Sequence, residues 1–130
     1  MSETSETSET SETSETSGTS GTRTQADERL LAADVQAHEL LRDDAGGALA
    51  TSSTVLGTLD HTEVGLWEAG PGTDHDTEVD EVFVVLSGAA TVTFADGSSV
   101  ALRPGVAVRL HAGDRTRWDV TERLRKLYLA

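Results

Sequence analysis

The feature that most constrains this chain is a regular alternation of short apolar runs and turn residues, which continues from about residue 50 to the C-terminus. A Gly-Pro-Gly turn at 70–72 precedes an acidic segment, and Glu81 then opens an apolar run that stops at Ser87 and Gly88. Further turns follow at 96–97, 104–105 and 112–114. Short strands at such even spacing are typical of an all-β sandwich or barrel.

The pattern predicts a set of short, separate strands. Residues 73–80 carry His75 among four acidic residues, and we expect them to form a solvated loop. Period-two alternation places Glu81 on the same face as Phe83, and both faces of this strand are apolar after Glu81. The predicted strands are 51–59, 62–69, 81–88, 89–94, 98–102, 106–110, and two more around Trp118 and Leu127.

Several short motifs in this region together resemble the cupin superfamily. The shared features, in chain order, are Gly-Leu-Trp-Glu at 65–68, His75, Glu81, Gly88, the turn at 104–105, Gly113, Trp118 and Arg-Lys-Leu-Tyr at 125–128. Their order and spacing are similar to the small cupin domain of (S)-ureidoglycine aminohydrolase. The resemblance implies a single-domain cupin jelly-roll β-barrel, and it implies no single chemistry because cupins host many.

Composition divides the chain into three parts. Residues 1–24 are mostly Ser-Glu-Thr and Ser-Gly-Thr triplets without apolar residues after Met1, which predicts a disordered tail. Residues 25–47 form a helical and linker segment, in which Leu31, Val35 and His38 at helical spacing favour a helix over 25–42 with Thr24 as its N-cap. Residues 48–130 form the cupin domain.

Charge and composition limit the kinds of partner that this protein can bind and indicate where it lies in the cell. The net charge of −13 disfavours nucleic acid, and the absence of cysteine, of a signal sequence and of a long apolar run favours a cytoplasmic protein that does not contact membranes. Six arginines and the only lysine lie between residues 103 and 126. We interpret them mainly as cross-strand partners of the acidic residues earlier in the chain, with an anion-binding patch as the alternative.

The resemblance implies a metal site of three imidazoles and one carboxylate, which this chain retains only in part. His75 and Glu81 match, whereas Thr77 and Thr116 stand where two histidines are expected. His111 takes the place of a turn proline, which directs its side chain away from the site. Two protein ligands rarely hold a transition metal, so we expect neither a metal nor another cofactor.

The same residues suggest a ligand site inside the barrel. If the Glu81 face is interior, as the resemblance implies, its carboxylate enters the cavity beside Phe83 and needs a partner, either His75 or an arginine of the last third. Trp67 and Trp118 can form flat walls of a pocket. The candidate ligand-binding residues are therefore His75, Glu81, Phe83, Trp118 and Trp67.

Three functions fit these features. The first is binding of a small polar metabolite in the cavity, in ureide, amino-acid or sugar-acid metabolism, with catalysis left open. The second is a metal-dependent isomerase, lyase or hydrolase, and the third is a non-catalytic structural or regulatory module. Because a small barrel with a two-sided apolar strand has surface left to cover, we also expect a homodimer, which light scattering would test.

Overall fold

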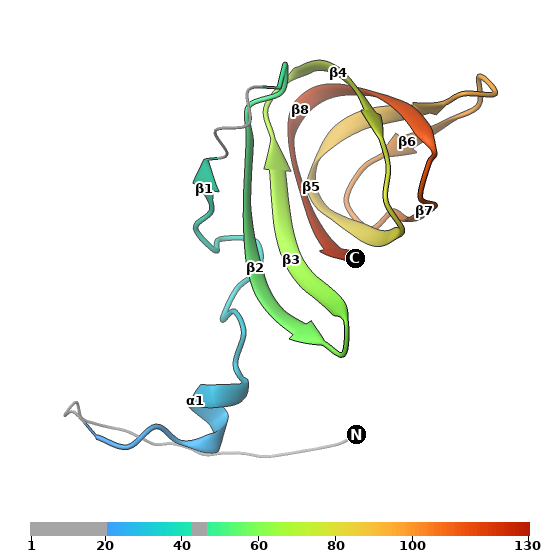
Figure 1. Cartoon of the computed structure of the whole chain (residues 1–130). Helices are drawn as coiled ribbons and strands as arrows, with labels where there is room; N and C mark the ends of the chain where they lie inside the picture. Colours follow the sequence, from blue (N-terminus) through green and yellow to red (C-terminus); the bar gives the residue numbers. More distant parts are fainter. Residues whose placement is uncertain (1–20, 43–46) are drawn as a thin grey trace. The chain divides into compact units, whose positions relative to one another are not determined.

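A computed structural model describes residues 21–42 and 47–130, and it shows a mostly β protein with one short helix (Figure 1). The predicted disordered tail falls almost wholly outside the described residues. The chain divides into two units, 1–30 and 31–130, and the second contains every strand. The elements are α1 (Gln25–Arg29), β1 (Leu41–Arg42), β2 (Thr51–Leu59), β3 (Thr62–Ala69), β4 (Gly72–Thr77), β5 (Glu81–Phe94), β6 (Ser99–Leu102), β7 (Ala107–Leu110) and β8 (Arg115–Leu129).

Helix α1 begins as the sequence predicts and ends much earlier. The Thr24 hydroxyl accepts a hydrogen bond from the Asp27 N–H, and the Asp27 carboxylate accepts one from the Thr24 N–H, which is a complete capping box. The helix ends at Arg29 and buries no residue. A helix this short gains little by itself, because most helical stability comes from packing an apolar face. The prediction of a helix over 25–42 is therefore wrong beyond its first turn.

Tertiary contacts hold the rest of that segment in a non-helical path. The Arg125 guanidinium donates to the backbone carbonyls of Val35 and His38 at 2.9 and 2.8 Å. The Gln36 side chain donates to the Leu86 carbonyl at 2.9 Å. Carbonyls engaged by side chains of the barrel satisfy the backbone without a helical ladder, so the local preference for helix is overridden.

All strand pairs are antiparallel, and they form one continuous sheet that curls on itself. The main order is β1-β2-β3-β8-β5-β6, while β4 pairs with β8 and β7 pairs with β5. Strand β8 therefore contacts β3 and β5 along its C-terminal half, and β4 and β5 along its N-terminal half. The sheet closes into the small cupin-like fold expected from the sequence, and β5 and β8 are its longest strands (Figure 1).

Two pairs of predicted strands are in fact single bent strands. The sequence predicted a break at Ser87 and Gly88, but β5 continues through it, and β8 likewise joins the strands around Trp118 and Leu127. The pairing of β5 with β8 shifts register three times between Val85 and Ala90. Such irregularities bend a strand, so the turn residues mark a corner of the sheet and not the end of a strand.

Strand β4 corrects a second prediction. The acidic segment was predicted to be a loop, but the chain is extended and paired with β8 over Gly72–Thr77. Among the described strands it pairs only with β8, so it is an edge strand. Charged residues are common on exposed edges, where they disfavour pairing with another chain. The acidic composition that indicated a loop is therefore compatible with this particular kind of strand.

The interior lies on the Glu81 face of β5, as the cupin resemblance implied. Phe83 and Val85 are almost completely buried, whereas Val82 on the opposite face is 42% exposed. The exposed apolar Leu129 pairs directly with Val82. The core consists of Leu49, Ala69, Phe83, Val85, Ala90, Val92, Leu102, Val108, Leu110, Trp118, Val120 and Leu124.

Gly88 at the corner of β5 should tolerate no side chain. Its φ is 93°, and an added Cβ would collide with the backbone carbonyl of Arg123. We expect Gly88→Ala to cost clearly more than the roughly 1–2 kcal/mol of left-handed strain alone. Chemical denaturation measures the difference. Gly97→Ala is the control, since its φ is 89° and nothing lies within 4 Å of its added Cβ, and an equal loss in both variants would contradict the corner collision.

Candidate ligand-binding cavity

A cavity of about 350 Å³ opens into the interior of the curled sheet. Its walls come from β2, β3, β4, β5 and β8, and from the segments that precede β2 and β5. Four of the five predicted ligand residues, Trp67, His75, Glu81 and Trp118, line it. The fifth, Phe83, is not in the lining and lies behind it, with its ring against Lys126. The lining residues are Gly47, Leu49, Thr51, Ser53, Trp67, Asp74, His75, Asp76, Glu78, Glu81, Trp118, Lys126 and Tyr128.

An ion pair between Lys126 and Glu81 lies in the wall of this cavity. The Lys126 Nζ donates to Glu81 Oε2 at 2.7 Å, and the exposed fractions of the two side chains are 7% and 10%. The expected partner of Glu81 was His75 or an arginine, and that prediction is wrong because the partner is the only lysine in the chain. A buried carboxylate requires such a partner, since an uncompensated charge in the interior is strongly unfavourable.

Three aromatic rings surround the Lys126 ammonium. Its Nζ lies 4.4 Å from the ring centroid of Phe83, 4.7 Å from that of Trp67 and 5.0 Å from that of Trp118. The rings also contact one another, with centroids 5.8 Å apart for the two tryptophans and 5.7 Å for Phe83 and Trp118. The predicted aromatic wall residues therefore enclose a cation, which their electron-rich faces attract.

A second buried carboxylate, Glu78, lies in the cavity wall near Trp118. Its Oε2 accepts hydrogen bonds from the Thr116 hydroxyl at 2.6 Å and from Trp118 Nε1 at 2.9 Å. Thr116, which stands where a cupin histidine is expected, is thus a hydrogen-bond donor to a carboxylate. Glu78 was not among the predicted site residues, because the sequence placed it in a solvated loop.

Acidic residues of β4 extend the negative charge toward the cavity mouth. Asp74 and Asp76 are in register with Trp118 and Thr116, which places them on the interior face. Burial raises the pKa of the Asp76 carboxyl, and the Glu78 and Asp74 carboxylates raise it further, whereas the Thr77 N–H and the Lys126 ammonium lower it. The cavity therefore favours protons and other positive or hydrogen-bond-donating groups over anions.

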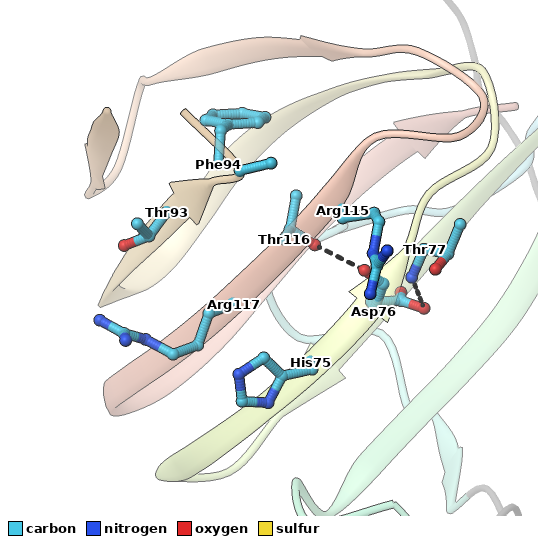
Figure 2. Close-up of a pocket in the computed structure, with 9 residues that line it drawn as sticks. His75, Asp76, Thr77, Thr93, Phe94, Arg115, Thr116 and Arg117 are labelled. Carbon is cyan, nitrogen blue, oxygen red and sulfur yellow. Dashed lines mark hydrogen bonds between the residues drawn. The ribbon is translucent and has the colours of Figure 1, made fainter. Parts of the chain in front are cut away.

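His75 occupies a different environment from the other predicted residues. It is exposed on β4 and in register with Arg117, whose side chain is half-exposed and bonded to Asp119. Figure 2 shows its imidazole near Arg117 in a second hollow, which adjoins the cavity. Alternation along β4 explains this position, because the residues on either side of His75 face the interior.

The side chains present do not fit the metal site that the cupin fold implies. Lys126 already supplies a cation to Glu81, and its ammonium would repel a metal ion at the same carboxylate. Among residues 21–42 and 47–130, no group of three or more His, Cys, Asp or Glu side chains is arranged to hold a metal. Donors for a transition metal at Glu81 are therefore lacking, and we derive no chemistry through a metal.

The structure adds two residues to the site that the sequence analysis missed, Lys126 and Glu78, and two signals in the sequence could have identified Lys126. Lys126 is the only lysine in a chain with nine arginines, so a lysine at this position indicates a specific role for its side chain. Period-two alternation within 124–128 also groups Leu124, Lys126 and Tyr128 on one face. For Glu78 the sequence offers no comparable signal, since it lies among exposed acidic residues before β5 begins.

The curled antiparallel sheet around a cavity defines a small cupin-like fold. Residues 56–128 match the family model of the EutQ-like cupin domain, which is more than half of the chain. The chain belongs to this EutQ-like cupin family. No curated protein sequence matches it.

Solved structures of similar proteins share this fold. A protein described as ethanolamine utilization protein Q from Salmonella typhimurium LT2 is 21% identical, with a TM-score of 0.60 over 70% of this chain and 76% of that one. EutQ of Clostridium difficile is 24% identical, with a TM-score of 0.58 over 68% and 73%. A Rhizobium leguminosarum protein of unknown function is 27% identical, with a TM-score of 0.56 over 65% and 82%.

The comparisons refine the resemblance drawn from the motifs. The superfamily is confirmed, and the matching family is the EutQ-like one. None of the findings specifically supports the (S)-ureidoglycine aminohydrolase domain. Within the part of the chain that the structure describes, no helix has the length and apolar character needed to cross a membrane.

The Lys126–Glu81 pair should behave as a coupled unit. Removing one partner leaves the other charge buried, so we expect Glu81→Gln and Lys126→Met each to lower the free energy of unfolding by about 3–5 kcal/mol. The double variant should lose much less than the sum of the two single losses. Urea denaturation of the four proteins measures the coupling, and additive losses would contradict it.

The raised pKa of Asp76 predicts the direction in which folding stability changes with pH. The folded state holds this proton more tightly than the unfolded chain, whose pKa is near 3.8, so folding is favoured as pH falls through the folded pKa. Asp76→Asn should therefore raise Tm at pH 7, with a gain that shrinks as pH approaches 3.8.

Asp80→Asn is the control of opposite sign. The Ala112 N–H and the Arg109 side chain lower the pKa of Asp80, so its charge stabilises the fold at neutral pH. That variant should have a lower Tm at pH 7 and converge with the wild type in acid. The same sign of change in both variants at pH 7 would contradict the prediction.

Proposed function

We propose that this EutQ-like cupin binds a small, polar metabolite in the cavity around Lys126 and Glu81. The observation that carries the proposal is the charge of the lining, where four carboxylates, those of Asp74, Asp76, Glu78 and Glu81, face a single ammonium. Such a lining favours ligands that are cationic or rich in hydrogen-bond donors. The volume of about 350 Å³ suits a small metabolite.

The other side chains of the cavity wall indicate which hydrogen-bonding groups and flat surfaces the ligand should have. Lys126 has three N–H donors and uses one for Glu81, so it can also donate to a carbonyl or hydroxyl oxygen of a ligand. Trp67 and Trp118 offer flat apolar faces. Within ureide, amino-acid and sugar-acid chemistry, a ureide combines several N–H donors with a carbonyl acceptor and is the best match. A sugar acid would bring another negative charge into an acidic cavity.

A metal-dependent enzyme is the less favoured alternative. The ammonium at Glu81 and the threonines at positions 77 and 116 oppose it, because a hydroxyl is a poor ligand for the metals that imidazole binds. Elemental analysis of protein purified without chelator distinguishes the two functions. About one equivalent of a transition metal per chain would favour the enzyme over the proposal.

A thermal-shift screen tests the proposal directly. We expect ureides, amino alcohols or polyols to raise Tm, since a ligand at 100 times its Kd adds about 2.7 kcal/mol to stability. Sugar acids and divalent metals should raise it less. If acids or metals alone stabilise the protein, the proposed ligand class is wrong.

A pair of variants localises the binding to the cavity. Glu81→Gln should abolish binding of the ligand found in the screen, measured by calorimetry at a temperature where circular dichroism shows the variant folded. Glu122→Gln removes the same charge from an exposed position of β8 outside the cavity, and should bind normally. Equal affinity in the two variants would place the site elsewhere.

A further inference from the structure

A second hollow of about 670 Å³ lies against strands β4, β8 and the end of β5. It adjoins the cavity, since His75 and Asp76 contribute to both. Figure 2 shows two arginines and a histidine among its lining residues. The complete lining, here called the basic groove, is His75, Asp76, Thr77, Thr93, Phe94, Ala95, Arg115, Thr116 and Arg117.

Strand register places the basic side chains of the groove on one face of the sheet. His75 pairs with Arg117, which pairs with Thr93 on the other side, and Thr77 pairs with Arg115. Residues that pair across antiparallel strands project to the same face. The alternate residue of β8 between the two arginines, Thr116, is buried and bonded to Glu78. The side chains of His75, Thr77, Thr93, Arg115 and Arg117 therefore share the outward face. Phe94 pairs with Thr116 and lies on the interior face with it.

Asp76 lines the groove but does not add its negative charge to the outward face. Asp76 lies in the groove lining but pairs with the buried Thr116, which puts its carboxylate on the interior side of β4. The other nearby carboxylate, Asp119, is bonded to Arg117 Nε at 2.9 Å and to the Thr73 hydroxyl at 2.7 Å. The outward face of the groove thus carries more positive than negative charge, within a chain whose net charge is −13.

Cross-strand pairing accounts for most basic residues of the last third, but not for Arg115. Arg109 pairs with Asp80, Arg123 and Arg125 with Glu68, and Lys126 with Glu81. Across residues 21–42 and 47–130, Arg115 makes no side-chain hydrogen bond or ion pair. Its guanidinium is therefore available to a ligand, with Arg117 two residues away on the same face.

We infer that the basic groove binds a small organic anion through a multi-oxygen group, a phosphate or a carboxylate. Guanidinium groups recognise both with paired N–H donors. The hydroxyls of Thr77 and Thr93 and the imidazole of His75 add hydrogen-bond donors on the same face. This site is separate from the proposed cavity site and prefers the opposite charge.

Titration calorimetry at fixed ionic strength tests this site with three probes: inorganic phosphate, pyrophosphate and citrate. We expect pyrophosphate or citrate to bind, and Arg115→Gln to weaken that binding about tenfold, which is about 1.4 kcal/mol. Binding of the phosphate probes alone identifies a phosphate group as the natural anion, and binding of citrate alone identifies carboxylates. Failure of all three probes to bind would overturn the inference.

Two control variants separate this site from other effects. Arg103→Gln removes one positive charge at an exposed turn position that does not line the groove, and should change the affinity less than twofold. An equal loss in Arg103→Gln and Arg115→Gln would mean general charge attraction and would overturn the site. Glu81→Gln, which disables the cavity, should leave anion affinity unchanged, so the two proposals fail independently.

Discussion

The buried pair of Lys126 and Glu81 is the interaction on which the interior depends. It joins β8 to β5 inside the sheet, and three aromatic rings exclude water around its ammonium. Two charges in a low-dielectric interior persist only with good geometry and further compensation, which Trp67, Phe83 and Trp118 supply here. The same arrangement keeps a charged donor and a charged acceptor at the wall of a cavity.

Strand β8 supplies both candidate sites because it is long and bent. Its N-terminal half presents Arg115 and Arg117 outward and Thr116 and Trp118 inward, while its C-terminal half carries Lys126. The corner opposite Gly88 lets β5 follow this bend without losing its pairing with β8. One antiparallel pair therefore builds an acidic cavity on one face and a basic groove on the other.

The structure places the Lys126 ammonium beside Glu81, the carboxylate that the cupin resemblance assigned to a metal site. Threonines stand at the two positions, 77 and 116, where the resemblance led us to expect histidines, and Thr116 donates to a second carboxylate, Glu78. An ammonium fixed by the chain cannot offer open coordination positions, but it can donate hydrogen bonds to a ligand oxygen. This difference in donor chemistry is why the family fold alone does not define the function.

Local patterns determined much of this protein. Alternation identified the β class, the bounds of β2 and β3 and the shared face of Glu81 and Phe83, because side chains alternate with a period of two along a strand. The cupin resemblance indicated that this shared face is the interior one, and the structure buries Phe83 there. Only the tertiary structure decided the partner of Glu81, the burial of Glu78 and the path of residues 31–40. Each depends on contacts between residues distant in sequence, and local periodicity carries no information about which strand lies opposite.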